Sequence, residues 1–511
     1  MLSKIESRGI FGITAYRVDV EVDISKGIPS FSIVGLPDAV CRESSKRVIA
    51  AIKNSGYKLS SLRITVNLAP ACLKKEGAMY DLAIALGILT ALGMVDSDKL
   101  AGRVLCGELS LDGSLRPIAG ALSISDGLRG EKDKELIVPY SNFSEALAVN
   151  GVRAVACRSL NEVIAYLAEG LMPSLPIKAK RYKVKDLCKD FDYSDIKGNV
   201  YAKRAVEVAV AGAHNILLIG SPGVGKTMLA KRLPTIMDEL TEDESIETSK
   251  IYSVCGLLNK KSDLIKRPPF RMLHHSISYA GMVGGGAANN IRPGEISLAH
   301  NGVLFLDELP EFRRDVLEAL RQPLEEGMIR VSRVNMTVVY PSQFMFVAAM
   351  NPCPCGFLTH PEKACMCTAP QVQRYLSKIS GPLLDRIDMH IEIQPIKYEQ
   401  MRQKHSGESS LIIGARIKKA INIQKKRYEK CSFNFNSKLP HRLIDDICQI
   451  TDEAAQLLKN AMAELFMSAR AYDKILRVAR TIADLDEKPA IGIDEISEAI
   501  GYRCLDRTFW T

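Results

Sequence analysis

Short apolar runs and amphipathic segments alternate through the middle of the chain. Residues 216–219, 303–306 and 343–350 are apolar runs of strand length, and segments with helical periodicity lie between them. Strands that alternate with helices along a chain build a parallel sheet covered by helices. Because functional groups of such sheets gather at the carboxyl ends of the strands, we expect the chemistry of this chain there.

The first third of the chain mixes strand and helix periods. Residues 16–24 alternate apolar and polar side chains as a half-buried strand does, and residues 62–67 predict a second strand. Helices are predicted over residues 42–55 and, as a buried helix, over residues 82–94. An Asp-Gly pair at positions 112–113 predicts a hairpin turn. This region is therefore expected to be an α+β domain.

The C-terminal region has helical periodicity and many charges. From about residue 407 onward the pattern is helical, most clearly over residues 453–466 and 474–485. A lysine-rich stretch with two prolines and no period, residues 170–192, predicts a linker. The predicted fold class is therefore α/β, with an α+β domain, a central domain around a parallel sheet and a helical domain. Their predicted limits are residues 1–169, 193–395 and 396–511.

Composition and charge narrow the class of protein. The 511 residues are 47% hydrophobic and 25% charged, which is ordinary for a globular chain. The net charge of +9 permits a polyanionic partner such as nucleic acid without requiring one. The longest charge-free apolar run, residues 82–95, falls short of the roughly 20 residues that span a bilayer. The N-terminus lacks the apolar core of a signal peptide, so we expect a cytoplasmic protein with no membrane partner.

The string GSPGVGKT follows the first apolar run and opens a helical segment, which makes it a complete P-loop pattern. Backbone N–H groups in such a loop bind phosphate oxygens. Lys226 is predicted to reach the β- and γ-phosphates, and the Thr227 hydroxyl to bind Mg²⁺. The cofactors expected here are ATP and Mg²⁺. The predicted cofactor-binding residues are Gly220, Ser221, Pro222, Gly223, Val224, Gly225, Lys226, Thr227 and Asp307.

The other two strands also end in polar residues. Asp307 and Glu308 follow the second apolar run, where Asp307 is predicted to join the Mg²⁺ shell and Glu308 to activate water as a general base. The alternative is that Asp307 only caps a helix. Asn351 follows the third run, and its amide can hold that water or the γ-phosphate, although Asn-Pro is also a common turn. Arg386, in SGPLLDRID, can stabilise charge on the transferred phosphoryl group.

Four of the thirteen cysteines cluster in the string CPCGFLTHPEKACMC, namely Cys353, Cys355, Cys365 and Cys367. Four thiolates at this range can close a tetrahedral structural Zn²⁺ site, and His360 between the pairs could replace one of them. The usual zinc spacing is C-x₂-C, so reduced thiols without metal remain the alternative for these C-x-C pairs.

These strings resemble the YifB/ComM family of magnesium-chelatase-like AAA+ ATPases, and the resemblance covers nearly the whole chain. It implies a ring, expected to be a hexamer, in which Arg386 is an arginine finger that reaches a neighbouring subunit. It also implies a sensor-2 arginine in the helical domain, for which Arg470 is the first candidate and Arg477 the second. The chain departs from the family pattern at Asn199, where a Gln is usual. The matching strings lie at residues 195–234, 292–312, 320–327, 347–356 and 380–388.

The resemblance also implies partners. ComM-type members are similar to DNA helicases that drive branch migration in recombination and natural transformation, so single-stranded, forked or branched DNA and recombination proteins are the expected partners. Residues 328–340 alternate like a β-hairpin, and such inserts project toward the central pore, where Arg330 and Arg333 would meet phosphates. The alternatives are a magnesium-chelatase-type or protein-remodelling ATPase. A basic run over residues 416–430 scatters around a helix and is expected to be solvated.

The first domain resembles the catalytic domain of Lon proteases, which has a ribosomal S5-like fold. The resemblance rests on residues 73–93 and 107–120. The family's nucleophilic serine position holds Met79, and its lysine position falls on Ala121 and Leu122. An ATP-dependent protease is therefore disfavoured, because neither nucleophile nor base is present. We expect a catalytically inactive binding or assembly module.

Overall fold

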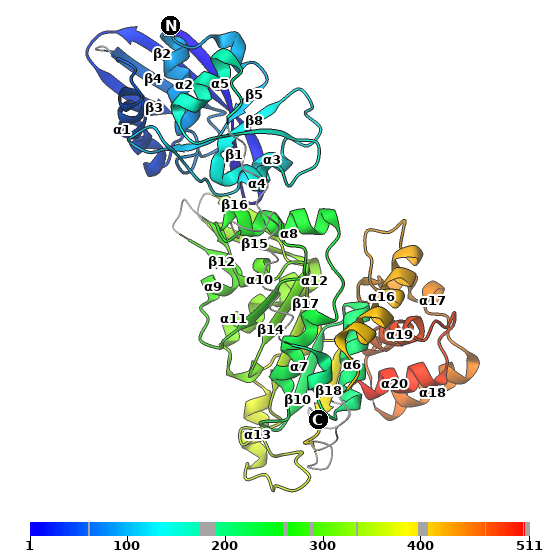
Figure 1. Cartoon of the computed structure of the whole chain (residues 1–511). Helices are drawn as coiled ribbons and strands as arrows, with labels where there is room; N and C mark the ends of the chain where they lie inside the picture. Colours follow the sequence, from blue (N-terminus) through cyan, green and yellow to red (C-terminus); the bar gives the residue numbers. More distant parts are fainter. Residues whose placement is uncertain are drawn as a thin grey trace.

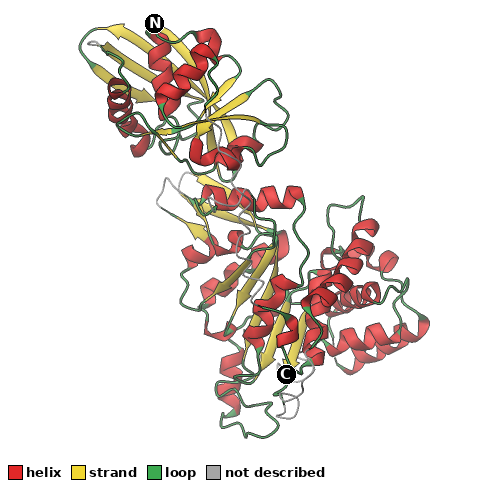
Figure 2. Cartoon of the chain, viewed as in Figure 1, coloured by secondary structure: helices red, strands yellow, loops and turns green. Residues whose placement is uncertain are grey.

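The computed structural model places three regions one after another along the chain, with the helical region beside the central one (Figure 1). Strands dominate the first region, the second alternates strands with helices, and the third is helical (Figure 2). In the described part of the chain, no helix is both long and apolar enough to cross a membrane. The structure describes residues 1–59, 62–173, 191–258, 264–286, 291–333, 336–396, 407–465, 467–503 and 505. The predicted linker therefore lies mostly outside the described residues.

The described strands of the first region form a mixed sheet with the order β3-β4-β2-β1-β5-β8-β9. Pairs β1–β2 and β2–β4 are antiparallel, and the others are parallel. The predicted hairpin is present, with β6 and β7 on either side of the Asp-Gly turn. The strands are β1 Leu2–Phe11, β2 Thr14–Lys26, β3 Ser30–Val34, β4 Leu62–Ala69, β5 Arg103–Leu105, β6 Glu108–Leu109, β7 Leu115–Arg116, β8 Glu135–Pro139 and β9 Arg153–Cys157.

Both predicted helices of this region are confirmed, with limits that follow their caps. Helix α1 begins at Ala39 because the Asp38 side chain accepts the Cys41 N–H, earlier than the apolar pattern indicates. Helix α2 is almost entirely buried and ends at Ala91, two residues before Gly93, whose φ of +73° is left-handed. The helices are α1 Ala39–Asn54, α2 Asp81–Ala91, α3 Ala121–Asp126, α4 Phe143–Ala146 and α5 Leu160–Glu169.

The central region has the predicted parallel sheet. Its described strands follow the order β11-β14-β17-β10-β18, and every neighbouring pair is parallel. A separate hairpin, β15–β16, confirms the alternation over residues 328–340. The strands are β10 Ile216–Gly220, β11 Phe270–Leu273, β12 Gly284–Gly285, β13 Arg292–Pro293, β14 Gly302–Leu306, β15 Met328–Arg333, β16 Met336–Pro341, β17 Phe344–Met350 and β18 Met389–Ile393.

Helices pack around this sheet (Figure 1). One buried cluster joins the helix α6, one face of the sheet and the helical region, so the third region is fixed to the second by a shared apolar core. The helices are α6 Val200–Gly212, α7 Lys226–Arg232, α8 Glu242–Val254, α9 Tyr279–Val283, α10 Glu295–Leu298, α11 Arg314–Ala319, α12 Arg321–Glu326, α13 Ala369–Leu376 and α14 Gly381–Leu384.

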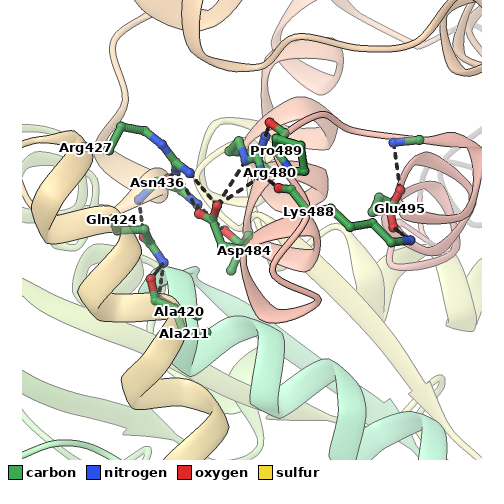
Figure 3. A network of polar contacts seen from close by, with 12 residues as sticks. Ala211, Ala420, Gln424, Arg427, Asn436, Arg480, Asp484, Lys488, Pro489 and Glu495 are labelled. Carbon is green, nitrogen blue, oxygen red and sulfur yellow. Dashed lines mark hydrogen bonds and ion pairs between the residues drawn. The ribbon is translucent and has the colours of Figure 1, made fainter.

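The helical region confirms both predicted C-terminal helices. Helix α19 begins before the predicted residue 474 because the Ser468 side chain accepts the Ala471 N–H and caps it. A buried network holds this region together (Figure 3). Its centre is Asp484, 1% exposed, which accepts hydrogen bonds from Arg427 and Arg480. The helices are α16 Ser410–Arg427, α17 Ile444–Ile447, α18 Asp452–Glu464, α19 Ala469–Leu485 and α20 Ile493–Gly501.

The first region contacts the central one along helix α8 and strand β16. Lys250 of α8 forms an ion pair of 2.7 Å with Asp126 of α3. The Gly120 N–H donates to the Ser253 carbonyl at 3.1 Å. At the β1–β2 turn, a side-chain carbon on Gly12 would lie 2.9 Å from Cγ1 of Val338. The first region therefore rests directly on the β15–β16 hairpin.

Candidate nucleotide-binding site

The phosphate loop is built from a strand, a turn and a helix. Strand β10 ends at Gly220, and helix α7 begins at Lys226. Gly223 and Gly225 have left-handed φ values of +82° and +94°, which glycine adopts without a steric penalty. The loop borders a cavity of about 400 Å³. Its lining residues are Pro222, Gly223, Val224, Gly225, Lys226, Thr227, Met228, Asp307, Glu308, Met350 and Asn351.

Lys226 and Asn351 meet inside this cavity. The Lys226 ammonium donates to Asn351 Oδ1 at 3.0 Å and to the Ser221 carbonyl at 3.0 Å. Burial lowers the Lys226 pKa to about 8, while the charges of Asp307 and Glu308 act in the opposite direction. A phosphate at this place would add negative charge beside the buried ammonium. The structure thus brings two of the predicted residues together.

Thr227 and Asp307 form the second pair in the cavity. The Thr227 hydroxyl donates to Asp307 Oδ2 at 2.7 Å. Asp307 stands at the end of strand β14, which is buried along its whole length. Hydroxyl and carboxylate oxygens are ligands that Mg²⁺ prefers, so this pair fits the ion that accompanies ATP. The alternative interpretation of Asp307 as a mere helix cap does not explain its bond to Thr227.

Glu308 adopts an unusual backbone conformation beside Asp307. Its φ of +55° is left-handed, which is uncommon for a residue with a β-carbon. Its side chain is 59% exposed and borders the cavity, and His275 Nδ1, from a residue outside the cavity lining, lies 3.7 Å from Glu308 Oε2. Strain of this kind persists at functional sites because the surroundings hold it. The conformation keeps the carboxylate accessible to a water molecule in the cavity.

Sequence reasoning missed His275. Strand β11 ends at Leu273 and pairs in parallel with β14, so residues 274 and 275 share the sheet edge with Glu308. The sequence contains a signal for it, because the polar pair His274 and His275 follows a short apolar strand. The sequence alone does not show that this strand, β11, lies beside β14. The His274 and His275 rings pack together with their centroids 4.0 Å apart.

The two predicted arginines lie outside this cavity. Arg386 Nη1 donates to the Pro382 carbonyl at 2.7 Å, and its Nη2 pairs with Glu325, whose pKa that hydrogen bond lowers. Arg470 is 75% exposed, and its Nη1 lies 3.3 Å from Asp385 Oδ2. Neither arginine is among the described residues that line the cavity. The structure therefore brings Arg386 and Arg470 together on another surface.

Comparisons with known proteins agree with this architecture. Residues 192–401 match the family described as magnesium chelatase, subunit ChlI. Residues 20–142 match the family described as subunit ChlI of Mg-chelatase, and residues 407–503 match its C-terminal family. YifB of Escherichia coli strain K12 is 41% identical over 511 residues, covering 99% of this chain and 98% of that protein. The competence protein ComM of Haemophilus influenzae is 42% identical over 512 residues, with the same coverage.

The chain belongs to the YifB/ComM family of magnesium-chelatase-like AAA+ ATPases. The chain also has a more distant relative. Lon protease 2 of Bacillus subtilis is 26% identical over 163 residues, which is 29% of either chain. At the two positions where the Lon pattern needs a nucleophile and a base, Met79 packs against the core and Leu122 is fully buried. These apolar side chains leave no Ser–Lys pair at those positions.

Arg470 and Arg477 were the two candidates for the sensor-2 role in this family. Arg477 is mostly buried, and its Nη2 lies 3.9 Å from Asp473 on the same helix. Arg470 instead projects from the N-terminal end of α19 and reaches the loop that carries Arg386. Arg470 is therefore the more exposed of the two candidates, and its role as the sensor stays a prediction.

The four clustered cysteines converge beside the phosphate loop. The sulfur of Cys353, which is fully buried, lies 3.4 Å from that of Cys355 and 3.6 Å from that of Cys365. With Cys367 included, all four sulfurs lie within 4.8 Å of one another. Backbone N–H groups of Phe357 and Met366 lower the Cys355 pKa to about 6. The predicted cluster is therefore assembled.

His360 does not join the cysteine cluster. Its Nδ1 accepts the backbone N–H groups of Glu362 and Lys363 at 3.1 and 3.0 Å. The group of potential metal ligands found among the described residues contains four cysteines without this histidine. The suggestion that His360 replaces a cysteine is therefore wrong. Its ring instead accepts backbone hydrogen bonds that stabilise the turn after it.

The basic run of helix α16 is largely neutralised within the chain. Several of its cations form ion pairs with carboxylates of the central and helical regions. These pairs join Arg416 to Glu207, Lys418 to Asp238, Lys419 to Glu487 and Arg427 to Asp484. These pairs stabilise the packing of α16 against the central region and within the helical one. By contrast, Arg330 and Arg333 on β15 are exposed.

Proposed function

We propose that this AAA+ ATPase is an ATP-driven hexameric ring motor that acts on DNA and promotes branch migration in recombination or natural transformation. The observation that carries the proposal is that the predicted site residues of one chain lie in two separate places. One chain supplies the cavity with Lys226, the Thr227–Asp307 pair and Glu308, whereas Arg386 and Arg470 lie elsewhere. Such a site is complete only when a second copy brings its arginines to the cavity.

The proposed hydrolysis follows from the cavity residues. The loop N–H groups and Lys226 bind the β- and γ-phosphates of ATP. Bound Mg²⁺ would neutralise phosphate charge, and the side chains of Thr227 and Asp307 would hold the ion. Glu308 accepts a proton from water, whose oxygen attacks the γ-phosphorus while the bond to the β-phosphate oxygen breaks, releasing ADP and phosphate. The Asn351 amide positions the water or the γ-phosphate.

Arg386 and Arg470 are proposed to act on the nucleotide of the neighbouring subunit. Positive charge at the γ-phosphate stabilises the transition state and makes hydrolysis depend on subunit contact. The two arginines come from different regions, Arg386 from the loop after α14 and Arg470 from α19. A change in the neighbour's nucleotide would therefore act on both regions at once.

DNA is the proposed substrate on two grounds. ComM, a relative that matches the whole chain, is named a competence protein. The β15–β16 hairpin presents Arg330 and Arg333 to solvent, and Arg330 contacts Glu326 through an exposed pair at 3.5 Å and the Met328 sulfur at 3.9 Å. Exposed guanidinium groups on the solvent face of a hairpin suit contact with phosphates. The matches to magnesium chelatase families keep a motor that acts on a protein partner as the second candidate.

The test is strand displacement on a forked duplex and on a four-way junction. The proposal predicts displacement that requires ATP and is absent in the Glu308→Gln variant, which should still bind ATP. Arg330→Ala with Arg333→Ala should weaken DNA binding and reduce its salt dependence. An ATP hydrolysis rate that DNA does not change, together with no strand displacement on either substrate, would instead support the motor that acts on a protein.

A further inference from the structure

The cysteine cluster has the dimensions of a metal site. Four ligands placed tetrahedrally around zinc, with Zn–S bonds of about 2.3 Å, lie about 3.8 Å from one another. The three sulfur separations among Cys353, Cys355 and Cys365 are 3.4, 3.6 and 3.5 Å. They describe one face of such a tetrahedron, and Cys367 supplies the fourth corner within 4.8 Å.

The surrounding backbone is folded for this arrangement. The Gly356 N–H donates to the Cys353 carbonyl at 3.0 Å, closing a tight turn after the first pair. Gly356 adopts a left-handed φ of +83°, which this turn requires. In the second pair, the Cys367 N–H donates to the Cys365 sulfur at 3.4 Å. Such N–H groups stabilise the negative charge that metal-bound sulfurs carry.

A disulfide does not account for the cluster. A disulfide joins two sulfurs at about 2.05 Å and draws them away from a third. Here Cys353, Cys355 and Cys365 are in mutual contact at nearly equal distances, and all four cysteines are free thiols. Mutual contact of this kind is what a shared central ion produces. Full closure by four sulfurs leaves no position for substrate, which indicates a structural role.

The cluster also adjoins the nucleotide site. Cys353 lies two residues after Asn351, which contacts Lys226. A side-chain carbon on Gly356 would lie 2.5 Å from Cδ and 2.8 Å from Cγ of Pro222, so the Gly356 backbone packs directly on the phosphate loop. The first cysteine pair therefore belongs to a segment that touches both Asn351 and Pro222.

We propose that Cys353, Cys355, Cys365 and Cys367 bind one Zn²⁺ as thiolates, and that this ion clamps the segment after Asn351 against Pro222 of the phosphate loop. Binding takes the four sulfurs as thiolates, releases the protons of those that were still thiols, and cross-links the two turns that carry the cysteine pairs. Loss of the ion frees this segment and loosens the nucleotide cavity. The metal assignment stands without the proposed function, whereas its effect on the nucleotide rests on the phosphate loop binding ATP.

The metal itself is tested by elemental analysis of the full chain purified without added metal. The proposal predicts close to one zinc per chain, and near-complete loss of it in Cys365→Ser. Cys72→Ser is the matched control, since Cys72 is exposed and lies outside the cluster. Less than about 0.2 zinc per chain, or iron in place of zinc, would overturn the assignment. Circular dichroism of each variant identifies any that simply fail to fold.

The clamp is tested by changing the contact while leaving the ligands in place. In Gly356→Ala the new methyl group must displace Pro222, so this variant should keep its zinc and bind a fluorescent ATP analogue at least about tenfold more weakly. Gly151→Ala is the control, because Gly151 has a similar left-handed φ of +86° and a side-chain carbon there meets nothing within 4 Å. Unchanged affinity in zinc-loaded Gly356→Ala would overturn the clamp. A wild-type chain that binds no nucleotide would instead contradict the proposed function and leave the zinc content informative.

Discussion

Arg470 Nη1 lies 3.3 Å from Asp385 Oδ2, and Asp385 immediately precedes Arg386. A helix of the third region and a loop of the second thereby present two guanidinium groups together. Neither group is among the described residues that line the cavity of the same chain. An arginine that stabilises a transferred phosphoryl group must touch it, so these two are suited to the cavity of another copy.

The first prediction concerns Arg386. Arg386→Ala should bind ATP with nearly unchanged affinity, because the side chain lies outside its own cavity. Hydrolysis should fall by about a thousandfold or more, since the positive charge on the transition state is lost. Nucleotide binding and steady-state hydrolysis are to be measured on the same preparation.

Arg374→Ala serves as the control for Arg386→Ala, because Arg374 is an exposed arginine of α13. It should hydrolyse ATP at nearly the wild-type rate. Normal hydrolysis by Arg386→Ala would remove this residue from the mechanism.

The second prediction is a pH dependence of ATP binding. Burial lowers the Lys226 pKa to about 8. Below that pH the ammonium is already charged and attracts phosphate, whereas above it a proton must be taken up when ATP binds. Affinity should therefore weaken as pH rises above about 8, by at most about tenfold per pH unit.

Isothermal titration at several pH values measures this dependence. Lys226→Ala should bind ATP very weakly at every pH. Lys226→Arg keeps its charge throughout the range, so any affinity that it retains should not change with pH. A wild-type affinity that is flat from neutral pH to well above 8 would contradict the assigned role of the Lys226 charge.

The third prediction concerns His275 as a positioning residue for Glu308. The two side chains approach to 3.7 Å at the shared edge of β11 and β14. His275→Ala should leave KM for ATP nearly unchanged and lower kcat by about tenfold, because Glu308 loses a neighbour that orients it. His441→Ala, which changes a histidine paired with Asp473 in the helical region, should alter neither parameter. Equal effects on KM and kcat would indicate a general structural defect instead.

The fourth prediction concerns stability of the helical region. Asp484 is buried and bonds both Arg427 and the almost fully buried Arg480 (Figure 3). Asp484→Ala leaves these guanidinium groups without their carboxylate and should destabilise the fold by about 3–5 kcal/mol. Asp486→Ala removes a more exposed partner of Arg204 and should cost less than about 1 kcal/mol. Thermal unfolding followed by circular dichroism compares the two, and equal shifts would contradict the ranking.

Local features were predictable from the sequence, whereas the meeting of distant segments was not. The phosphate loop and the strands that end at Asp307 and Asn351 follow from patterns within a few residues. The neighbouring position of β11 and β14 depends on sheet order, so His275 was not found. The proximity of Arg386 and Arg470 depends on how α19 packs against the central region, which no local period encodes. The roles of these residues stay predictions.

The central claim is that a second copy completes the nucleotide site. The most direct test mixes Lys226→Ala and Arg386→Ala chains, each inactive alone, under conditions that allow subunits to exchange. A site with an intact phosphate loop from one chain and an intact arginine from the other then forms at head-to-tail contacts, in about a quarter of positions. The account predicts that ATP hydrolysis returns to about that fraction of the wild-type rate. Mixed assemblies that form yet stay inactive would contradict it.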